Sequence, residues 1–213
     1  MEITVLIDNK DSWLHDYVSE LSSSIELLGH NVHFEVRHTD VRSGDVLILL
    51  GCNRIFRSLS LNHKNLVVHE SDLPKGRGMS PLTWQILEGK NEVKVTLLEA
   101  DENMDEGLIY NQVSIRLDGT ELVDDWRRLQ FEATQDLILD FLKRYPNVPG
   151  FEQIGEPTYY RKRDFSDSEL DVDLSLKSQF NHLRVVDNKR YPAWFQLNGE
   201  KYKLTIERLD DRF

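Results

Sequence analysis

Three short, continuous apolar runs constrain the fold more than any other feature of this sequence. They lie at Ile3 to Ile7, Val46 to Leu50 and Leu66 to Val68, and they are rich in β-branched residues. Runs this short and this apolar are typical of strands buried on both faces. Helical stretches separate them, which predicts an α/β protein with a Rossmann-like, doubly wound and mainly parallel sheet.

The spacing of apolar residues predicts the remaining elements of the main sheet. A period of 3.6 residues indicates a helix, and alternation indicates a strand. The expected helices are Trp13 to Leu28, Arg54 to Leu59, Pro81 to Leu87, and Glu121 to Tyr145. The further expected strands are Asn31 to Val36, Val93 to Leu98 and Leu108 to Ile115. Pro146 ends the last helix, because proline cannot continue one.

The pattern changes after residue 146, so we expect a main domain over residues 1–146 and a small, mostly β subdomain over 147–213. Asn198-Gly199 is a strong hairpin signal, because both residues tolerate positive φ. The other elements expected in this part are a short helix at Leu174 to Asn181 and strands at Leu183 to Val186, Ala193 to Leu197 and Lys201 to Ile206.

Composition excludes several classes of protein. The chain has 213 residues and a formal net charge of −11. A protein that grips a long nucleic acid normally carries a basic face, so we expect no nucleic-acid partner. No apolar run approaches the roughly 20 residues of a membrane span, and the start lacks the pattern of a signal peptide. With a single cysteine, Cys52, and no metal-ligand spacing of histidines, we expect a cytoplasmic protein without a metal.

One segment, from His69 to Gly107, places two titratable side chains at strand ends. His69 follows an apolar run, and Asp105 lies 36 residues later, beyond a loop, a helix and a strand. Ligands of open α/β sheets bind outside the carboxyl ends of the strands. A neutral imidazole accepts a proton near neutral pH, and a neighbouring carboxylate fixes its tautomer. Such a pair suits the attack of an amine on a carbonyl carbon, whose oxyanion must also be stabilised.

Each of these residues also has a simpler interpretation. A histidine after a strand is more often structural, and an aspartate in the turn Asn103 to Gly107 most often only forms the turn. The glycines of Lys75-Gly-Arg-Gly78 allow close approach to an anion, yet this stretch matches neither a P-loop nor a dinucleotide fingerprint. Taken singly, these features leave structural and functional roles open.

Taken together, the residues of this segment resemble the formyltransferase fold family, whose members use 10-formyltetrahydrofolate. The family carries a His-x-Ser-x-Leu-Pro-x-x-x-Gly run after a strand. A proline, a Trp-Gln-Ile-like helix, a Val-Thr strand and an Asp-x-Gly loop follow. The matching residues are His69, Ser71, Leu73, Pro74, Gly78, Pro81, Trp84 to Ile86, Val95, Thr96, Asp105 and Gly107. Upstream, Leu50 to Phe56 is similar to the family's loop near the folate pteridine.

The C-terminal part narrows the resemblance. Tyr159 to Arg163, Leu183-Arg184, Tyr191 to Phe195 and Asn198 to Leu204 look like the tail of the sugar-nucleotide N-formyltransferases, most like the branch in the pseudaminic acid pathway. The resemblance implies two small-molecule partners: folate, and a nucleotide-linked amino sugar such as a UDP- or dTDP-4-amino-4,6-dideoxy sugar. It also implies a homodimer, because related sugar formyltransferases dimerise through this part.

The resemblance also assigns roles to individual residues. His69 is the expected proton acceptor or oxyanion stabiliser, and Asp105 is expected to support proton movement and to hold the pteridine loop. Lys75, Arg77 and Gly78 are expected to bind the phosphates or the sugar of the acceptor. The pterin ring of the donor is expected against Arg54, Phe56, Ala100, Asp101, Glu102 and Asn103.

One position departs from the family pattern. The family places an asparagine two residues before the histidine, where its amide stabilises the oxyanion, and this chain has Val67 there. Valine has no donor, and losing an oxyanion donor typically costs about 10²–10³ in rate. Asn65, on the same strand, is one candidate replacement, and Asn53 and Asn103 are others. Alternatively, protonated His69 acts alone, or the protein binds its ligands without catalysis.

Two other functions stay open at this point. The first is formyl transfer to another acceptor, either initiator methionyl-tRNA or a small ribonucleotide; the acidic net charge argues against tRNA. The second is a folate- or nucleotide-binding protein that has lost catalysis, which would explain Val67.

Overall fold

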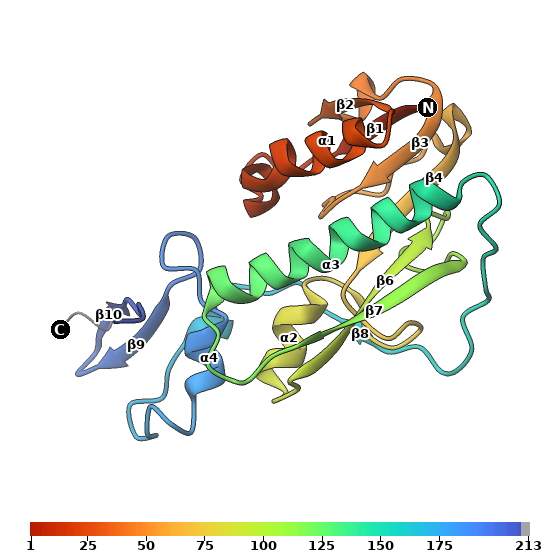
Figure 1. Cartoon of the computed structure of the whole chain (residues 1–213). Helices are drawn as coiled ribbons and strands as arrows, with labels where there is room; N and C mark the ends of the chain where they lie inside the picture. The colour runs from red at the N-terminus through yellow and green to blue at the C-terminus, as the bar shows by residue number, and fades with distance from the viewer. Residues whose placement is uncertain (210–213) are drawn as a thin grey trace.

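A six-stranded sheet forms the centre of the computed structural model, which describes residues 1–209 (Figure 1). Its strands are β1 (Glu2–Leu6), β2 (Asn31–Glu35), β3 (Gly44–Leu49), β4 (Asn62–His69), β6 (Glu92–Glu99) and β7 (Ile109–Arg116). They lie in the order β2-β1-β3-β4-β6-β7. The first four are mutually parallel, and β6 and β7 are antiparallel to their neighbours. The predicted, mainly parallel α/β sheet is therefore confirmed.

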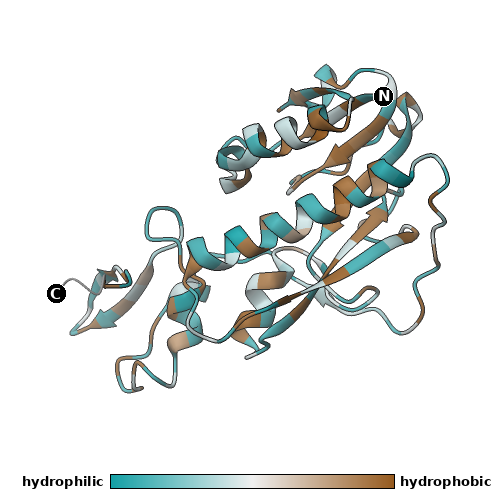
Figure 2. Cartoon of the chain, viewed as in Figure 1, coloured by the Kyte–Doolittle hydropathy of each residue, from teal (hydrophilic) through white to brown (hydrophobic). Residues whose placement is uncertain are grey.

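Helices cover one face of this sheet. The α-helices are α1 (Val18–Leu27), α2 (Pro81–Leu87), α3 (Val123–Arg144) and α4 (Phe180–Arg184), and the 3₁₀ turns are η1 (Trp13–Tyr17), η2 (His38–Asp40), η3 (Leu59–Leu61) and η4 (Phe165–Ser168). In Figure 1, α1 and α3 lie side by side over the sheet. The main apolar cluster fills the space beneath them, and Figure 2 shows the apolar character of the strands that contribute to it.

The long helix α3 forms where the sequence predicts it, because its charges suit its ends. Asp124 and Asp125 lie in its first turn, and Lys143 and Arg144 lie in its last turn. These charges complement the helix dipole, and Pro146 follows the end of the helix. The helix packs on β6 and β7 and buries Trp126, Phe131, Thr134, Leu137, Ile138, Phe141 and Leu142.

The helix predicted at Arg54 to Leu59 is wrong. This stretch is irregular except for η3. The reason is the buried carboxylate of Asp8, which accepts hydrogen bonds from the backbone nitrogens of Asn53 (2.6 Å) and Arg54 (3.2 Å). Side-chain acceptors of this kind compete with helical hydrogen bonds for backbone donors. A contact across 45 residues thus overrides the local pattern.

Two predictions near the C-terminus are also wrong. The predicted helix at Leu174 to Asn181 and the predicted strand at Leu183 to Val186 are replaced by α4, which begins at Phe180. Leu183, Val185 and Val186 are all buried. A short apolar run fits a buried helix as well as a buried strand, so periodicity alone does not separate the two.

The remaining strands are short and form two small sheets, both of which include strands from the C-terminal part. β5 (Arg77–Gly78) pairs with β8 (Tyr159–Tyr160) in parallel, and β9 (Ala193–Leu197) forms the predicted hairpin with β10 (Glu200–Leu204). Asn198 and Gly199 turn the hairpin with φ values of 52° and 87°. The hairpin projects from the body of the molecule in Figure 1. The division at residue 146 stays a prediction. No helix within residues 1–209 has the length and apolarity that a membrane span needs.

Candidate active site

The structure brings His69 and Asp105 together. His69 is the last residue of β4, and Asp105 lies in the loop between β6 and β7. Nδ1 of His69 is 3.6 Å from Oδ1 of Asp105, and each side chain is only 7% exposed. Asp105 has a φ of 58°, a left-handed conformation that aspartate tolerates better than most residues. An imidazole and a carboxylate are therefore paired at the end of the strand.

Backbone groups fix the orientation of this pair. Nε2 of His69 donates to the carbonyl oxygen of Gly76 (2.8 Å), and because a carbonyl only accepts, Nε2 carries a hydrogen. The backbone nitrogen of Gly78 donates to Oδ2 of Asp105 (2.9 Å). Nδ1 of His69 is thus the ring nitrogen that remains for proton exchange beside Asp105.

Two glycines allow the loops around the pair to approach other backbone closely. A Cβ at Gly78 would lie 2.3 Å from the carbonyl oxygen of Tyr160, and Gly78 has a φ of +100°. A Cβ at Gly107 would lie 1.9 Å from the carbonyl oxygen of Glu99. Only glycine fits such contacts without displacement. The first contact fixes the position of the loop after His69, and the second fixes the position of the loop that carries Asp105.

A cavity of about 350 Å³ lies beside the pair. Gly78, Val67 and both members of the pair line it. Five of the six residues expected at the pterin ring also line it, namely Arg54, Phe56, Ala100, Asp101 and Asn103, whereas Glu102 does not. The carboxylate of Asp8 holds the loop that includes Arg54, through the hydrogen bonds described above. We call this side of the cavity the donor end.

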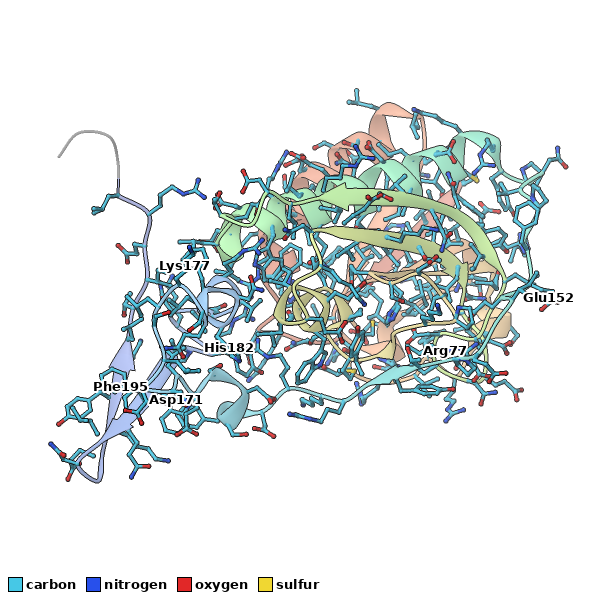
Figure 3. The ribbon with its side chains drawn as sticks, turned by 90° about the horizontal axis from the view of Figure 1, so that it is seen from below. Arg77, Glu152, Asp171, Lys177, His182 and Phe195 are labelled. Atoms are coloured by element: carbon cyan, nitrogen blue, oxygen red, sulfur yellow. The ribbon has the colours of Figure 1, made fainter. Side chains whose placement is uncertain are left out.

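Three of the expected site residues lie away from the cavity. The side-chain amide of Asn65 donates to the carbonyl of Leu59 (3.0 Å) instead, and Asn65 does not line the cavity. Lys75 and Arg77 do not line it either. The guanidinium of Arg77 is held by Glu106 (2.6 Å) and by Gln153 (2.7 Å), so it ties two loops together. Figure 3 shows Arg77 at the end of the molecule away from His182.

Another part of the cavity lining is basic, which sequence reasoning missed. Four cationic residues line it, namely Arg127, Lys162, Arg163 and Arg190. Asp187 pairs with Arg127 (3.0 Å) and with Arg190 (3.2 Å). The chain carries a net charge of −11, so this local surplus of positive charge is notable. We call this side the basic end.

Two guanidinium groups at the basic end are incompletely partnered. The Nε atoms of Arg127 and Arg163 are buried without a hydrogen-bond partner among the described residues. Within residues 1–209, Arg163 bonds only to the backbone oxygens of Val185 and Asp167 and to Ser168, each at 3.3 Å. Burial lowers the pKa of both arginines. Arg127 is paired with Asp187, whereas Arg163 has no carboxylate partner among residues 1–209; burying an uncompensated charge is unfavourable, so an anion bound at Arg163 would restore the balance.

A further carboxylate in the cavity, Glu70, was also missed. Its Oε1 accepts a hydrogen bond from the side-chain amide of Gln130 on α3 (2.6 Å). The signal for Glu70 was its place, directly after His69 at the strand end. The signal for Arg163 was the basic cluster Tyr160 to Arg163 in an acidic chain. Arg127 and Arg190 had no comparable signal, because both are ordinary surface residues by pattern.

No metal site accompanies the cavity within residues 1–209, where no group of three or more histidine, cysteine or carboxylate side chains could hold an ion. The free Cys52 lines the cavity, and burial raises its pKa to about 11. A thiol that stays protonated is a poor nucleophile.

Comparison with known proteins identifies one family for this chain. Residues 33–139 match the family model described as formyl transferase. A methionyl-tRNA formyltransferase of Caldicellulosiruptor saccharolyticus is 28% identical over 149 residues, which make up 68% of this chain and 47% of that protein. The chain thus spans about half the length of the curated relatives that it matches.

Solved structures share the fold. A methionyl-tRNA formyltransferase from Clostridium thermocellum superposes with a TM-score of 0.81 at 21% identity, over 100% of this chain and 95% of that one. A sugar N-formyltransferase from Shewanella superposes with a TM-score of 0.68 at 19% identity, over 99% of both chains. HypX from Aquifex aeolicus, in complex with tetrahydrofolic acid, superposes with a TM-score of 0.79 at 19% identity, over 93% of this chain and 36% of that one.

Proposed function

Because the chain belongs to the formyl transferase family, we propose that it transfers the formyl group of 10-formyltetrahydrofolate to the amine of a nucleotide-linked amino sugar. The observation that carries this proposal is the cavity, in which the His69–Asp105 pair lies alongside a basic end. The His69–Asp105 pair would serve the transfer of the formyl group, and the cations of the basic end would bind the phosphates of the nucleotide.

The donor end suits a pterin. The backbone nitrogens of Arg54, Ala100 and Glu102 already donate within the protein, to Asp8, Asn65 and Asp101. The carbonyl oxygens of this stretch are therefore the polar groups left for a ligand. They match the N–H donors at the edge of a pterin ring, and buried Phe56 offers an apolar surface beside them. A pre-formed cavity with a few placed polar groups is typical of a small-molecule site.

The pair supplies the electrostatics of the transfer. When an amine attacks the formyl carbon, negative charge develops on the formyl oxygen. Val67 offers no hydrogen bond to that oxygen, so we assign the role to a protonated Nδ1 of His69. Asp105, at 3.6 Å, stabilises the charged ring. Preorganised donors of this kind need no rearrangement as the charge develops.

The basic end suits the phosphates of the acceptor. Arginine binds phosphate oxygens through paired N–H groups, and Arg163 has no carboxylate partner among residues 1–209. The resemblance gave the phosphates or the sugar of the acceptor to Lys75, Arg77 and Gly78; of these three, Gly78 lines the cavity, and we propose the basic end for the phosphates. The 4-amino sugar and the pseudaminic acid pathway stay predictions from the C-terminal residues.

Incubation with 10-formyltetrahydrofolate and a panel of UDP- and dTDP-linked amino sugars, followed by mass spectrometry, tests the function. We expect one added formyl group on at least one acceptor, and none with His69→Ala. Arg163→Met is expected to raise KM for the acceptor at least tenfold, about the effect of one charged hydrogen bond. Arg128→Met is the matched control, with an unchanged acceptor KM, because Arg128 lies on α3 and pairs with Glu20 and Glu132 outside the cavity.

Initiator methionyl-tRNA is the second acceptor to test, because the curated relative above is a methionyl-tRNA formyltransferase. The net charge of −11 opposes the binding of a polyanion. Formylation of methionyl-tRNA with no product from any amino sugar would refute the proposed acceptor. Tight binding of the donor with no transfer to either acceptor would instead indicate a protein that has lost catalysis.

A further inference from the structure

Glu70 has a contact pattern that the proposed mechanism does not yet use. Its side chain lines the cavity next to His69. Oε1 accepts from the amide of Gln130 (2.6 Å), and the backbone carbonyl accepts from the amide of Gln85 (2.7 Å). Within residues 1–209, no side chain other than Gln130 is hydrogen-bonded to this carboxylate, and the remaining protein donor beside it is the backbone N–H of Glu70 itself. One oxygen of a firmly held carboxylate is therefore free to meet a ligand.

The charge of Glu70 is unfavourable for folding. Burial raises the pKa of Glu70, while the charge of His69 and the hydrogen bond from Gln130 act in the opposite direction. A carboxylate taken out of water is normally stabilised by a lysine or arginine, and here the direct partner is a neutral amide. If Glu70 only joined β4 to α3, a glutamine would serve equally well, because its amide oxygen also accepts from Gln130.

The proton balance of the transfer calls for a second group. The attacking amine must lose a proton, and the leaving nitrogen must gain one. Nε2 of His69 is committed to the carbonyl of Gly76, so Nδ1 alone serves the reaction. With Val67 in place of a donor, the proposed function assigns that nitrogen to the formyl oxygen. A nitrogen that points its hydrogen at the formyl oxygen cannot accept the proton of the amine in the same step.

We propose that Glu70 binds the amine of the acceptor through Oε2 and takes its proton as the new bond forms. This inference rests on the proposed function. The nitrogen lone pair forms the bond to the formyl carbon, and the N–H proton passes to Glu70. The old C–N bond then breaks with its electron pair on the leaving nitrogen, which takes the proton supplied by His69. Return of the proton from Glu70 to His69 restores both groups.

The arrangement also selects an amine over a hydroxyl group. An amino sugar arrives largely as an ammonium ion at neutral pH, and a carboxylate attracts that charge. The ammonium releases one proton to solvent before the attack, and the neutral amine that remains has the lone pair and the N–H proton used in the step above. The cations of the basic end, Arg127 and Arg163 among them, would repel an ammonium. Glu70 thus separates the cavity into a place for the phosphates and a place for the amine.

Two variants separate this role from a structural one. Glu70→Gln keeps an acceptor for Gln130 but removes the charge, whereas Gln130→Leu keeps the carboxylate and removes the hydrogen bond. We expect Glu70→Gln to lower kcat/KM for the acceptor by about 10²–10⁴, the range for loss of general base catalysis. Its affinity for the donor and its Tm are expected to be no lower than those of the wild type. Gln130→Leu is expected to lower Tm, with a smaller loss in kcat/KM.

The outcomes are distinguishable. A Glu70→Gln variant with wild-type kcat/KM would overturn the inference and leave the proposed function intact. Equal losses in kcat/KM for both variants, with a lower Tm in each, would show that the residue only joins β4 to α3, and would overturn it too. A wild-type chain that formylates no amino sugar overturns the acceptor class and the inference together.

Discussion

Replacing Gly107 by alanine is expected to disable the site while leaving the fold intact. The new Cβ would lie 1.9 Å from the carbonyl oxygen of Glu99, and contacts under 3.0 Å are essentially never seen, so the loop must move by about 1.1 Å. Asp105 lies two residues away in the same loop, 3.6 Å from His69. A misplacement of about 1 Å costs about 10² in rate, or about 2.7 kcal/mol of transition-state stabilisation.

The assay is kcat for formyl transfer to the acceptor found by mass spectrometry, with Tm measured in parallel. Gly44→Ala is a milder control far from the site, because its Cβ would lie 2.9 Å from the carbonyl oxygen of Glu2, at the opposite end of the sheet. We expect both variants to lower Tm and only Gly107→Ala to lower kcat. A Gly107→Ala enzyme with wild-type kcat would refute the view that this close contact positions Asp105.

Two further predictions concern stability and the donor end. Burial opposes ionisation of Asp187, but backbone hydrogen bonds and Arg127 lower its pKa to about 2. The ionised carboxylate therefore stabilises the fold above its unfolded pKa of about 4, and this stabilisation is lost as the pH falls towards 2. Asp187→Asn should therefore flatten the dependence of Tm on pH in that window, and an unchanged slope would contradict this. Asp8→Ala leaves the backbone nitrogens of Asn53 and Arg54 without their partner, which costs about 1–3 kcal/mol. It should raise KM for the donor and leave KM for the acceptor unchanged; a donor KM equal to that of the wild type would count against the role of this loop.

Much of the fold is predictable because its signals are local. The buried strands β1 and β3 appear as continuous apolar runs, since a strand covered on both faces has no solvent side. The hairpin turn at Asn198-Gly199 is predictable because only a few residue types tolerate positive φ. The pairing of His69 with Asp105 is less simple, because β6 runs antiparallel to β4 and ends beside Leu66; the loop after β6 brings Asp105 back to His69.

Other parts of the site are not predictable from local pattern, because distant residues decide them. The loop at Arg54 is irregular on account of Asp8, which precedes it by 46 residues. Asn65 directly precedes the predicted strand Leu66 to Val68, yet its amide donates to the carbonyl of Leu59 rather than lining the cavity. Arg77 follows a family motif, yet Glu106 and Gln153 hold its guanidinium away from the ligand space.

The segment from His69 to Gly107 separates what the sequence predicts from what the tertiary structure decides. The sequence by itself determined the strand that ends in a histidine, the glycines that permit tight turns and the carboxylate beside them. Only the tertiary structure decided that Glu70 meets Gln130, 60 residues away, and that Arg127 and Arg163 line the same cavity. The physical reason is that propensity and periodicity act within a few residues, whereas a charge is stabilised by whichever groups the packed chain places around it.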